Sequence, residues 1–144
     1  MINKDYKHSE ITDKIIGAFF KVYNTLGWGF LEKVYENAMV LELNKNGMHI
    51  VSQKPIKVYY EGEQVGFYAA DLLVNNAVIV ELKAAETLCE EHEAQLLNYL
   101  RATEIEAGLL LNFGKKPQFK KKVFSQEFKS IGIRTIALSD HSQS

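Results

Sequence analysis

Two acidic residues interrupt segments of the sequence that otherwise have the composition of buried strands. Asp71 lies within the apolar segment 67–74, and Glu81 lies within the apolar segment 77–82. A buried charge is costly unless it is paired or bound to a metal. Lys83 follows Glu81 by two residues, so on one strand both side chains point to the same face. Converging carboxylates and a lysine predict a Mg²⁺ or Mn²⁺ site with oxygen ligands, where the lysine positions or deprotonates a water or stabilises phosphate charge.

Whether the two carboxylates meet depends on the turn between their strands. A two-residue turn at 75–76 would place Asp71 opposite Val80 and would leave Glu81 on the other face. A three-residue loop at 75–77, or a bulge, would instead place Asp71 opposite Glu81. We predict the second arrangement. The competing interpretation is a surface hairpin in which the charged side chains form a cross-strand ion pair.

Two helices are predicted before these strands. The first begins after Ser9, a favourable N-cap residue, and ends before Gly27. Its apolar stripe has helical spacing: Ile11, Ile15, Phe19, Val22 and Leu26. The second covers about 30–46 and stops at Gly47. Its expected inward residues are Leu31, Val34, Ala38 and Leu41.

A third helix is predicted from 88 to about 102, after the carboxylates. Thr87 and Glu90 have the spacing of a capping box. The expected core residues of this helix are Leu96, Leu97 and Leu100.

The remaining pattern predicts a sheet. β-Branched and aromatic residues favour strands at 49–51, 56–60, 65–74 and 78–82, joined as an antiparallel meander. Pro55 indicates an edge strand or a break. The apolar run 107–113 predicts a strand covered on both faces. Two weaker strands are expected near 123–128 and 134–138. This order predicts one mixed α/β or α+β domain over 1–144, with its core at about 9–138 and a flexible tail at 139–144.

The charge of the chain is divided unevenly. The 144 residues include 17 Lys and Arg and 18 Asp and Glu, which argues against binding nucleic acid by bulk charge alone. Residues 1–112 carry 10 basic and 16 acidic side chains, whereas residues 113–144 carry 7 basic and 2 acidic ones. The basic segment could contact phosphates or form a solvated face. Its candidate residues are Lys115, Lys116, Lys120, Lys121 and Lys122.

The sequence also bears on location. Cys89 is the only cysteine, so no disulfide can form within the chain. The first residues lack the apolar run of a signal peptide, and no segment reaches the roughly 20 apolar residues of a membrane span. A cytoplasmic protein that does not associate with membranes is expected.

Four segments resemble one nuclease family. The pattern Asp71…Glu81-Leu82-Lys83 resembles the signature of the PD-(D/E)XK nuclease superfamily, with Ala70 where the signature has proline. The sequence GFLEKVY at 29–35 resembles the motif of the GxxExxY family within it. The segments HEAQLLNYL at 92–100 and LLNFG at 110–114 also resemble that family. The resemblance covers roughly residues 10 to 125.

This resemblance implies a fold and a set of roles. The fold would be a restriction-endonuclease-like core, a mixed central sheet flanked by helices. Asp71 and Glu81 would bind one or two Mg²⁺ or Mn²⁺ ions, with the Leu82 carbonyl as a further ligand. Lys83 would be the catalytic lysine, and Glu32 would be an additional acid near the metal. Gln95 and Tyr99 resemble the QxxxY element that flanks the site in nucleases related to the RecB type.

The helical polar residues can also be interpreted by their spacing. Tyr35 shares a face with Glu32, and His92 shares a face with Gln95 and Tyr99, which suggests that the third helix borders a wet cleft. Each of the two tyrosines could flank the site or be a core aromatic with a bonded hydroxyl. Two other residues are predicted to be ordinary: Glu36 on a solvated helix side, and Trp28, between two glycines, as a packing anchor in preference to a stacking platform.

The function that these features predict is a metal-dependent nuclease that hydrolyses phosphodiester bonds in DNA. The alternative is a catalytically silent module of the same fold that binds nucleic acid or protein. A chain of 144 residues has little room for a separate specificity domain, which favours a protein partner or a homo-oligomer. Kinase, serine-hydrolase and zincin chemistry lack support, because the sequence has no glycine-rich phosphate loop, GxSxG or HExxH motif.

Overall fold

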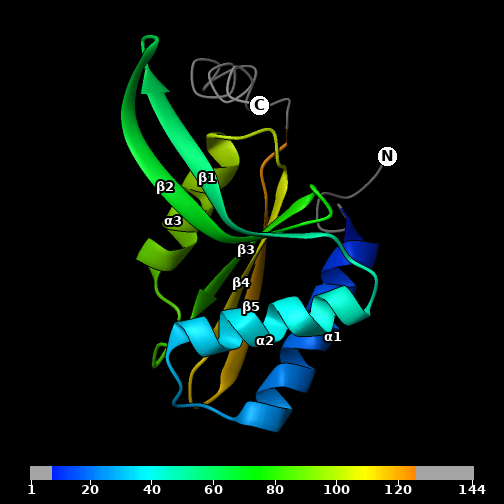
Figure 1. The fold of residues 1–144 in the computed structure, drawn as a ribbon. Helices are drawn as coiled ribbons and strands as arrows, with labels where there is room; N and C mark the ends of the chain where they lie inside the picture. The colour runs from blue at the N-terminus through cyan, green and yellow to red at the C-terminus, as the bar shows by residue number, and fades with distance from the viewer. Residues whose placement is uncertain (1–7, 126–144) are drawn as a thin grey trace.

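The computed structural model describes residues 8–125 of the chain. Within them, five strands form one sheet in the order β1-β2-β3-β4-β5 (Figure 1). The elements along the chain are α1 (Ser9–Leu26), α2 (Glu32–Lys45), β1 (Ile50–Tyr60), β2 (Glu63–Val74), β3 (Val78–Lys83), α3 (Glu90–Arg101), β4 (Ala107–Phe113) and β5 (Pro117–Val123).

The sheet is mixed, as the sequence predicted. Strands β1, β2 and β3 form the expected antiparallel meander, β3 pairs with β4 in parallel through α3, and β4 pairs with β5 antiparallel. Every residue of β4 is buried, which confirms a strand covered on both faces. Strand β5 was not predicted, and the strand expected near 123–128 lies partly outside the described residues, which end at 125. The predicted strand at 134–138 and the predicted tail at 139–144 lie outside the described residues.

Strand alternation divides the core into two layers. Val78, Val80 and Leu82 of β3 pack with α1 and α2 on one face of the sheet. Ile79 packs with Leu96 and the rest of the α3 layer on the other face. Figure 1 shows α1 and α2 together on one side of the sheet and α3 on the opposite side.

The inward face of α2 differs from the prediction. Leu31 is 81% exposed, Leu41 is 66% exposed, and Val34 is exposed as well. The buried face instead carries Tyr35, Glu36, Met39 and Leu43. Because α2 carries apolar residues on more than one side, its periodicity fits two orientations. The stack of Tyr35 on Phe113 lies on the buried side, with the ring centroids 4.2 Å apart.

Other expectations were confirmed or need correction at the ends of elements. Ile15, Phe19 and Val22 of α1 are buried as predicted. The predicted capping box of Thr87 and Glu90 is wrong. The N-cap of α3 is Cys89, whose N–H donates a hydrogen bond to Nδ1 of His92, three residues later, over 3.2 Å. Strand β1 runs unbroken through Pro55 at the edge of the sheet. None of the helices in residues 8–125 is long and apolar enough to cross a membrane.

Phe113 lies where α1, α2 and β4 meet, so its removal should be costly. Its ring is 1% exposed and contacts Tyr35 and Phe19, whose ring centroid is 4.8 Å away. Phe113→Ala should lower the free energy of unfolding by about 3–5 kcal/mol through lost contacts and a cavity. Phe119→Ala, the same change at an exposed site, should cost well under half as much in urea denaturation. Equal losses would contradict this assignment of the core.

Candidate active site

The turn between β2 and β3 sets the register of the site. The pairs Leu72 with Val80 and Val74 with Val78 leave a three-residue loop, Asn75–Ala77. Asn75 and Asn76 have φ values of 51° and 53°, in the left-handed region that asparagine tolerates better than most residues. The predicted three-residue loop is therefore confirmed, and the two-residue turn is excluded.

Asp71 and Glu81 lie across from each other where the paired part of β2 and β3 ends. The Asp71 N–H donates to Glu81 Oε2 over 2.7 Å, and the Leu82 N–H donates to Asp71 Oδ2 over 2.8 Å. Side-chain carboxylates thus take the positions that backbone carbonyls hold further along the strands. Each carboxylate uses one oxygen in this exchange, which leaves its second oxygen for another ligand.

Burial makes this pair of carboxylates unfavourable as two negative charges. Glu81 is 4% exposed, and its burial, followed by the charge of Asp71, raises the pKa of Glu81 from 4.5 to about 8. Burial also raises the pKa of Asp71, and the charges of Glu36 and Glu32 add to the effect. The site therefore favours a bound proton or a cation.

Two glutamates of α2 contribute to this negative field. Glu32 is exposed in the first turn of α2. Glu36 is buried, which corrects the predicted solvated position. Its carboxylate accepts hydrogen bonds from Lys33 Nζ at 2.9 Å and Gln53 Nε2 at 3.0 Å. Gln53 has a φ of 54° and lies across from Asp71 between the regular pairs of β1 and β2, so the bend in β1 directs its amide to Glu36.

Lys83 is held by residues of α3. Its Nζ donates to Gln95 Oε1 over 3.1 Å, and Gln95 Nε2 donates to the Tyr99 hydroxyl over 3.0 Å. Burial, followed by the charge of Glu81, raises the pKa of Tyr99 to about 12, so its hydroxyl stays neutral. The predicted polar stripe does line one cavity, in which His92, Gln95 and Tyr99 all take part. His92 also accepts the N-cap hydrogen bond of α3.

Tyr35 is a buried core aromatic with a bonded hydroxyl, one of the two predicted alternatives. Its hydroxyl donates to the Gly27 carbonyl over 2.7 Å and accepts from the Phe30 N–H over 3.2 Å. Tyr35 therefore fixes the loop that leads into Glu32. It acts on the site by positioning this loop.

The five candidate lysines do not gather on one surface. Lys120 and Lys122 both pair with Glu93 at 2.7 Å, and their hydrogen bonds lower the pKa of Glu93 to about 2. Lys121 projects to the other face of β5, where it reaches Thr12 of α1. Lys115 Nζ lies 5.3 Å from the Trp28 ring centroid. Lys116 is exposed in the turn before β5.

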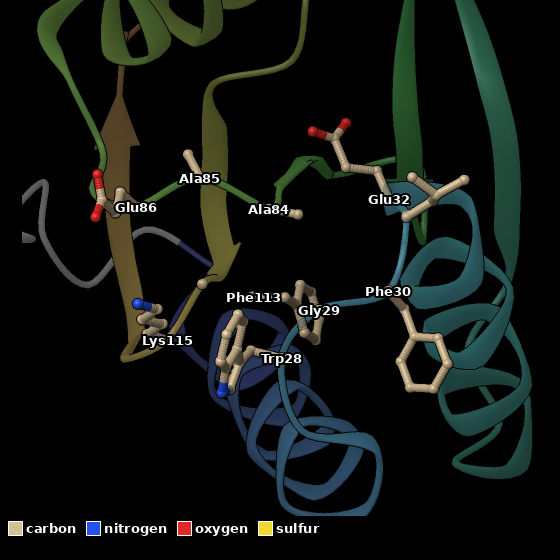
Figure 2. Close-up of a pocket in the computed structure, with 11 residues that line it drawn as sticks. Trp28, Gly29, Phe30, Glu32, Ala84, Ala85, Glu86, Phe113 and Lys115 are labelled. Carbon is tan, nitrogen blue, oxygen red and sulfur yellow. The ribbon is translucent and has the colours of Figure 1, made fainter.

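A pocket of about 480 Å³ is lined by Glu32 and Lys115 among others (Figure 2), whereas Asp71, Glu81 and Lys83 are not among its lining residues. Its floor includes Ala84 and Ala85, directly after Lys83. Asn112, fully buried, clamps Ala85 by donating to its carbonyl and accepting from its N–H, both at 2.9 Å. Sequence reasoning gave no role to Asn112, although one polar residue inside the apolar run of β4 was a usable signal.

The donor atoms fit a hard divalent cation. Carboxylate oxygens are the ligands that Mg²⁺ prefers, and Mg²⁺ commonly takes one or two carboxylates and keeps several waters. In the described part of the chain, no three His, Cys, Asp or Glu side chains are arranged as a complete protein cage. The Asp71–Glu81 pair can therefore supply part of a coordination shell.

The raised pKa of Glu81 predicts how stability depends on pH without metal. The neutral form of Glu81 is favoured in the folded state, so the stability that this group contributes should be full below pH 4.5 and should be lost as the pH rises through about 8. Glu81→Gln should flatten this fall and raise the Tm at pH 8 by several degrees. The control Glu63→Gln, at an exposed position, should leave the profile of Tm against pH unchanged. A flat wild-type profile would refute the predicted shift.

Comparisons with known proteins give one family match. When this chain is compared with the crystal structure of SSO0001, the TM-score is 0.48 and the sequence identity is 16%. The comparison covers 97% of this chain and 69% of that chain. No curated protein matches the sequence. The model of the PD-(D/E)XK nuclease superfamily matches residues 9–123, and the mixed sheet flanked by helices is consistent with its restriction-endonuclease-like fold. Since this match spans most of the sequence, the chain belongs to the PD-(D/E)XK nuclease superfamily.

Proposed function

We propose that this protein is a metal-dependent nuclease that hydrolyses phosphodiester bonds in DNA, of the GxxExxY type. The observation that carries the proposal is the pair formed by half-buried Asp71 and buried Glu81, close in sequence to Lys83. Two carboxylates with raised pKa values are poorly suited to a purely structural strand pair. They are well suited to an ion that neutralises them.

Asp71 and Glu81 would hold one or two Mg²⁺ or Mn²⁺ ions, with the Leu82 carbonyl as a further oxygen ligand, and Glu32 would add negative charge near the ions. A bound ion of this kind supplies a water of lowered pKa and positive charge near the scissile phosphate. The crossed hydrogen bonds of the pair fix both carboxylates before any ion or substrate arrives. This preorganisation lowers the cost of assembling the site.

Lys83 is the residue that would act on the phosphate or on the attacking water. Its ammonium group is oriented by Gln95, which is oriented in turn by Tyr99. An ammonium group held in place can orient a water for in-line attack and stabilise charge on the phosphate oxygens. Gln95 and Tyr99 are positioning residues in this scheme.

Substitutions at the two kinds of residue should separate metal binding from chemistry. Lys83→Ala should reduce cleavage of DNA in Mg²⁺ by at least about 100-fold, the lower end for loss of a proton-transfer group. Its binding of Mn²⁺ in calorimetry should stay within a few-fold of wild type. Asp71→Asn should weaken Mn²⁺ binding by more than about tenfold and abolish cleavage with it.

Matched controls are available on exposed helix positions. Asp13→Asn on α1 and Lys45→Ala on α2 make the same chemical changes away from the site, and both should cleave as wild type does. No cleavage of single-stranded, duplex or flap DNA by the wild type in either metal would reject the nuclease. DNA binding that persists in that case, unaffected by Asp71→Ala, would support the catalytically silent module of the same fold.

A further inference from the structure

Trp28 is exposed in a position that the core does not explain. It is 57% exposed, and it lines the pocket that Glu32 and Lys115 also line (Figure 2). The predicted role of packing anchor is therefore wrong. The neighbouring side chains Phe30 and Leu31 are also exposed, so this loop presents an apolar rim to solvent.

The loop that carries Trp28 is fixed on both sides. The Tyr35 hydroxyl forms hydrogen bonds with Gly27, the residue before Trp28, and with Phe30, two residues after Trp28. Gly27 and Gly29 have φ values of 71° and 110°, which side chains rarely adopt. These hydrogen bonds and backbone angles hold the loop in place, and the indole points outward from it.

The neighbouring segment of the pocket wall, which carries Lys115, is also fixed, and it is cationic. The Tyr23 hydroxyl is shared between the carbonyls of Gly114 and Lys115, at 2.8 and 2.7 Å. The Lys115 ammonium lies 5.3 Å from the Trp28 ring centroid. In Figure 2, Trp28 and Lys115 lie on one side of the pocket and Glu32 on the other, with Ala84 and Ala85 at its floor.

We propose that Trp28 and Lys115 form a subsite for a nucleotide of an unpaired DNA strand next to the scissile phosphate. The base stacks on the Trp28 indole, and Lys115 contacts the adjoining phosphate. Aromatic stacking accepts any base because every base has a π-face, and lysine adds the charge that phosphate requires. The inference rests on the proposed nuclease, since it names the form of strand that this site takes.

The chemistry of the subsite selects an unpaired strand. A base inside a duplex has neighbours on both faces, so it must leave the stack before an indole can cover it. An unpaired strand can offer a base at no such cost. The pocket is continuous from Glu32 along Ala84 and Ala85, the residues after Lys83, to Trp28. A strand bound along this pocket therefore passes Glu32 and the residues that follow Lys83 and reaches the indole.

The fluorescence of the protein reports this contact directly, because Trp28 is the only tryptophan. Short oligothymidylate, added in Ca²⁺ in place of Mg²⁺, should quench the emission in a saturable manner. A blunt duplex should bind with little quenching. Binding of end-labelled DNA, followed by anisotropy, gives the affinity independently of the indole.

Variants make the inference quantitative. Trp28→Ala should weaken single-strand binding by roughly 5- to 150-fold, the range for loss of one stacked base, and should leave duplex binding within about twofold. Trp28→Phe should recover part of the loss. Tyr60→Ala removes another exposed aromatic, at the end of β1 and 66% exposed, and should have no effect. Lys115→Ala should reduce the slope of the logarithm of the binding constant against the logarithm of the salt concentration by about one. Lys116→Ala, one residue further on, should change this slope less.

The outcomes separate this inference from the proposed nuclease. Single-strand binding without quenching, or with equal affinity in Trp28→Ala, overturns the subsite even if DNA is cleaved. Quenching and a weakened Trp28→Ala without any cleavage support the subsite and reject the nuclease. Absence of single-strand binding rejects the subsite.

Discussion

The pairing of a buried carboxylate, Glu81, with a half-buried one, Asp71, at one end of a strand pair is the constraint on which the rest of the site depends. Asp71 and Glu81 replace backbone acceptors with side-chain oxygens, so the two strands stay joined where the regular ladder stops. The use of carboxylate oxygens as acceptors also brings negative charge into a region that water barely reaches at Glu81. The fold is thereby biased toward states in which a proton or a cation neutralises this charge.

Several buried polar groups hold the backbone around this pair without touching it. Tyr35 fixes the loop before α2, Tyr23 fixes the end of β4, and Asn112 fixes the segment after β3. These segments approach closely: a Cβ at Gly114 would collide with the Ala85 carbonyl oxygen, so glycine is required there. The pocket walls are therefore set by hydrogen bonds in the interior, and surface side chains can face the substrate without also supporting the loops.

The strands could be predicted from the sequence better than the helix faces. Strand alternation has a period of two, so the interrupting acids Asp71 and Glu81 left only two registers, and the loop at 75–77 decided between them. Helix α2 carries apolar residues on several sides, and only packing against Phe113 selects the buried one. The burial of Glu36 follows from that orientation. The exposure of Trp28 depends on the hydrogen bonds of the Tyr35 hydroxyl to Gly27 and Phe30. No local sequence pattern indicates that these residues are bonded to Tyr35.

The two outer strands of the described sheet have a consequence of their own. Unpaired strand edges are templates on which other chains can add, and proteins block them with proline, irregular backbone and lysine. On β1 the edge carries Pro55 and the left-handed Gln53. On β5 it carries three consecutive lysines, Lys120 to Lys122, directed alternately to both faces. Within residues 8–125, the lysine run thus disfavours the addition of another chain at the outer edge of β5, next to a strongly apolar centre.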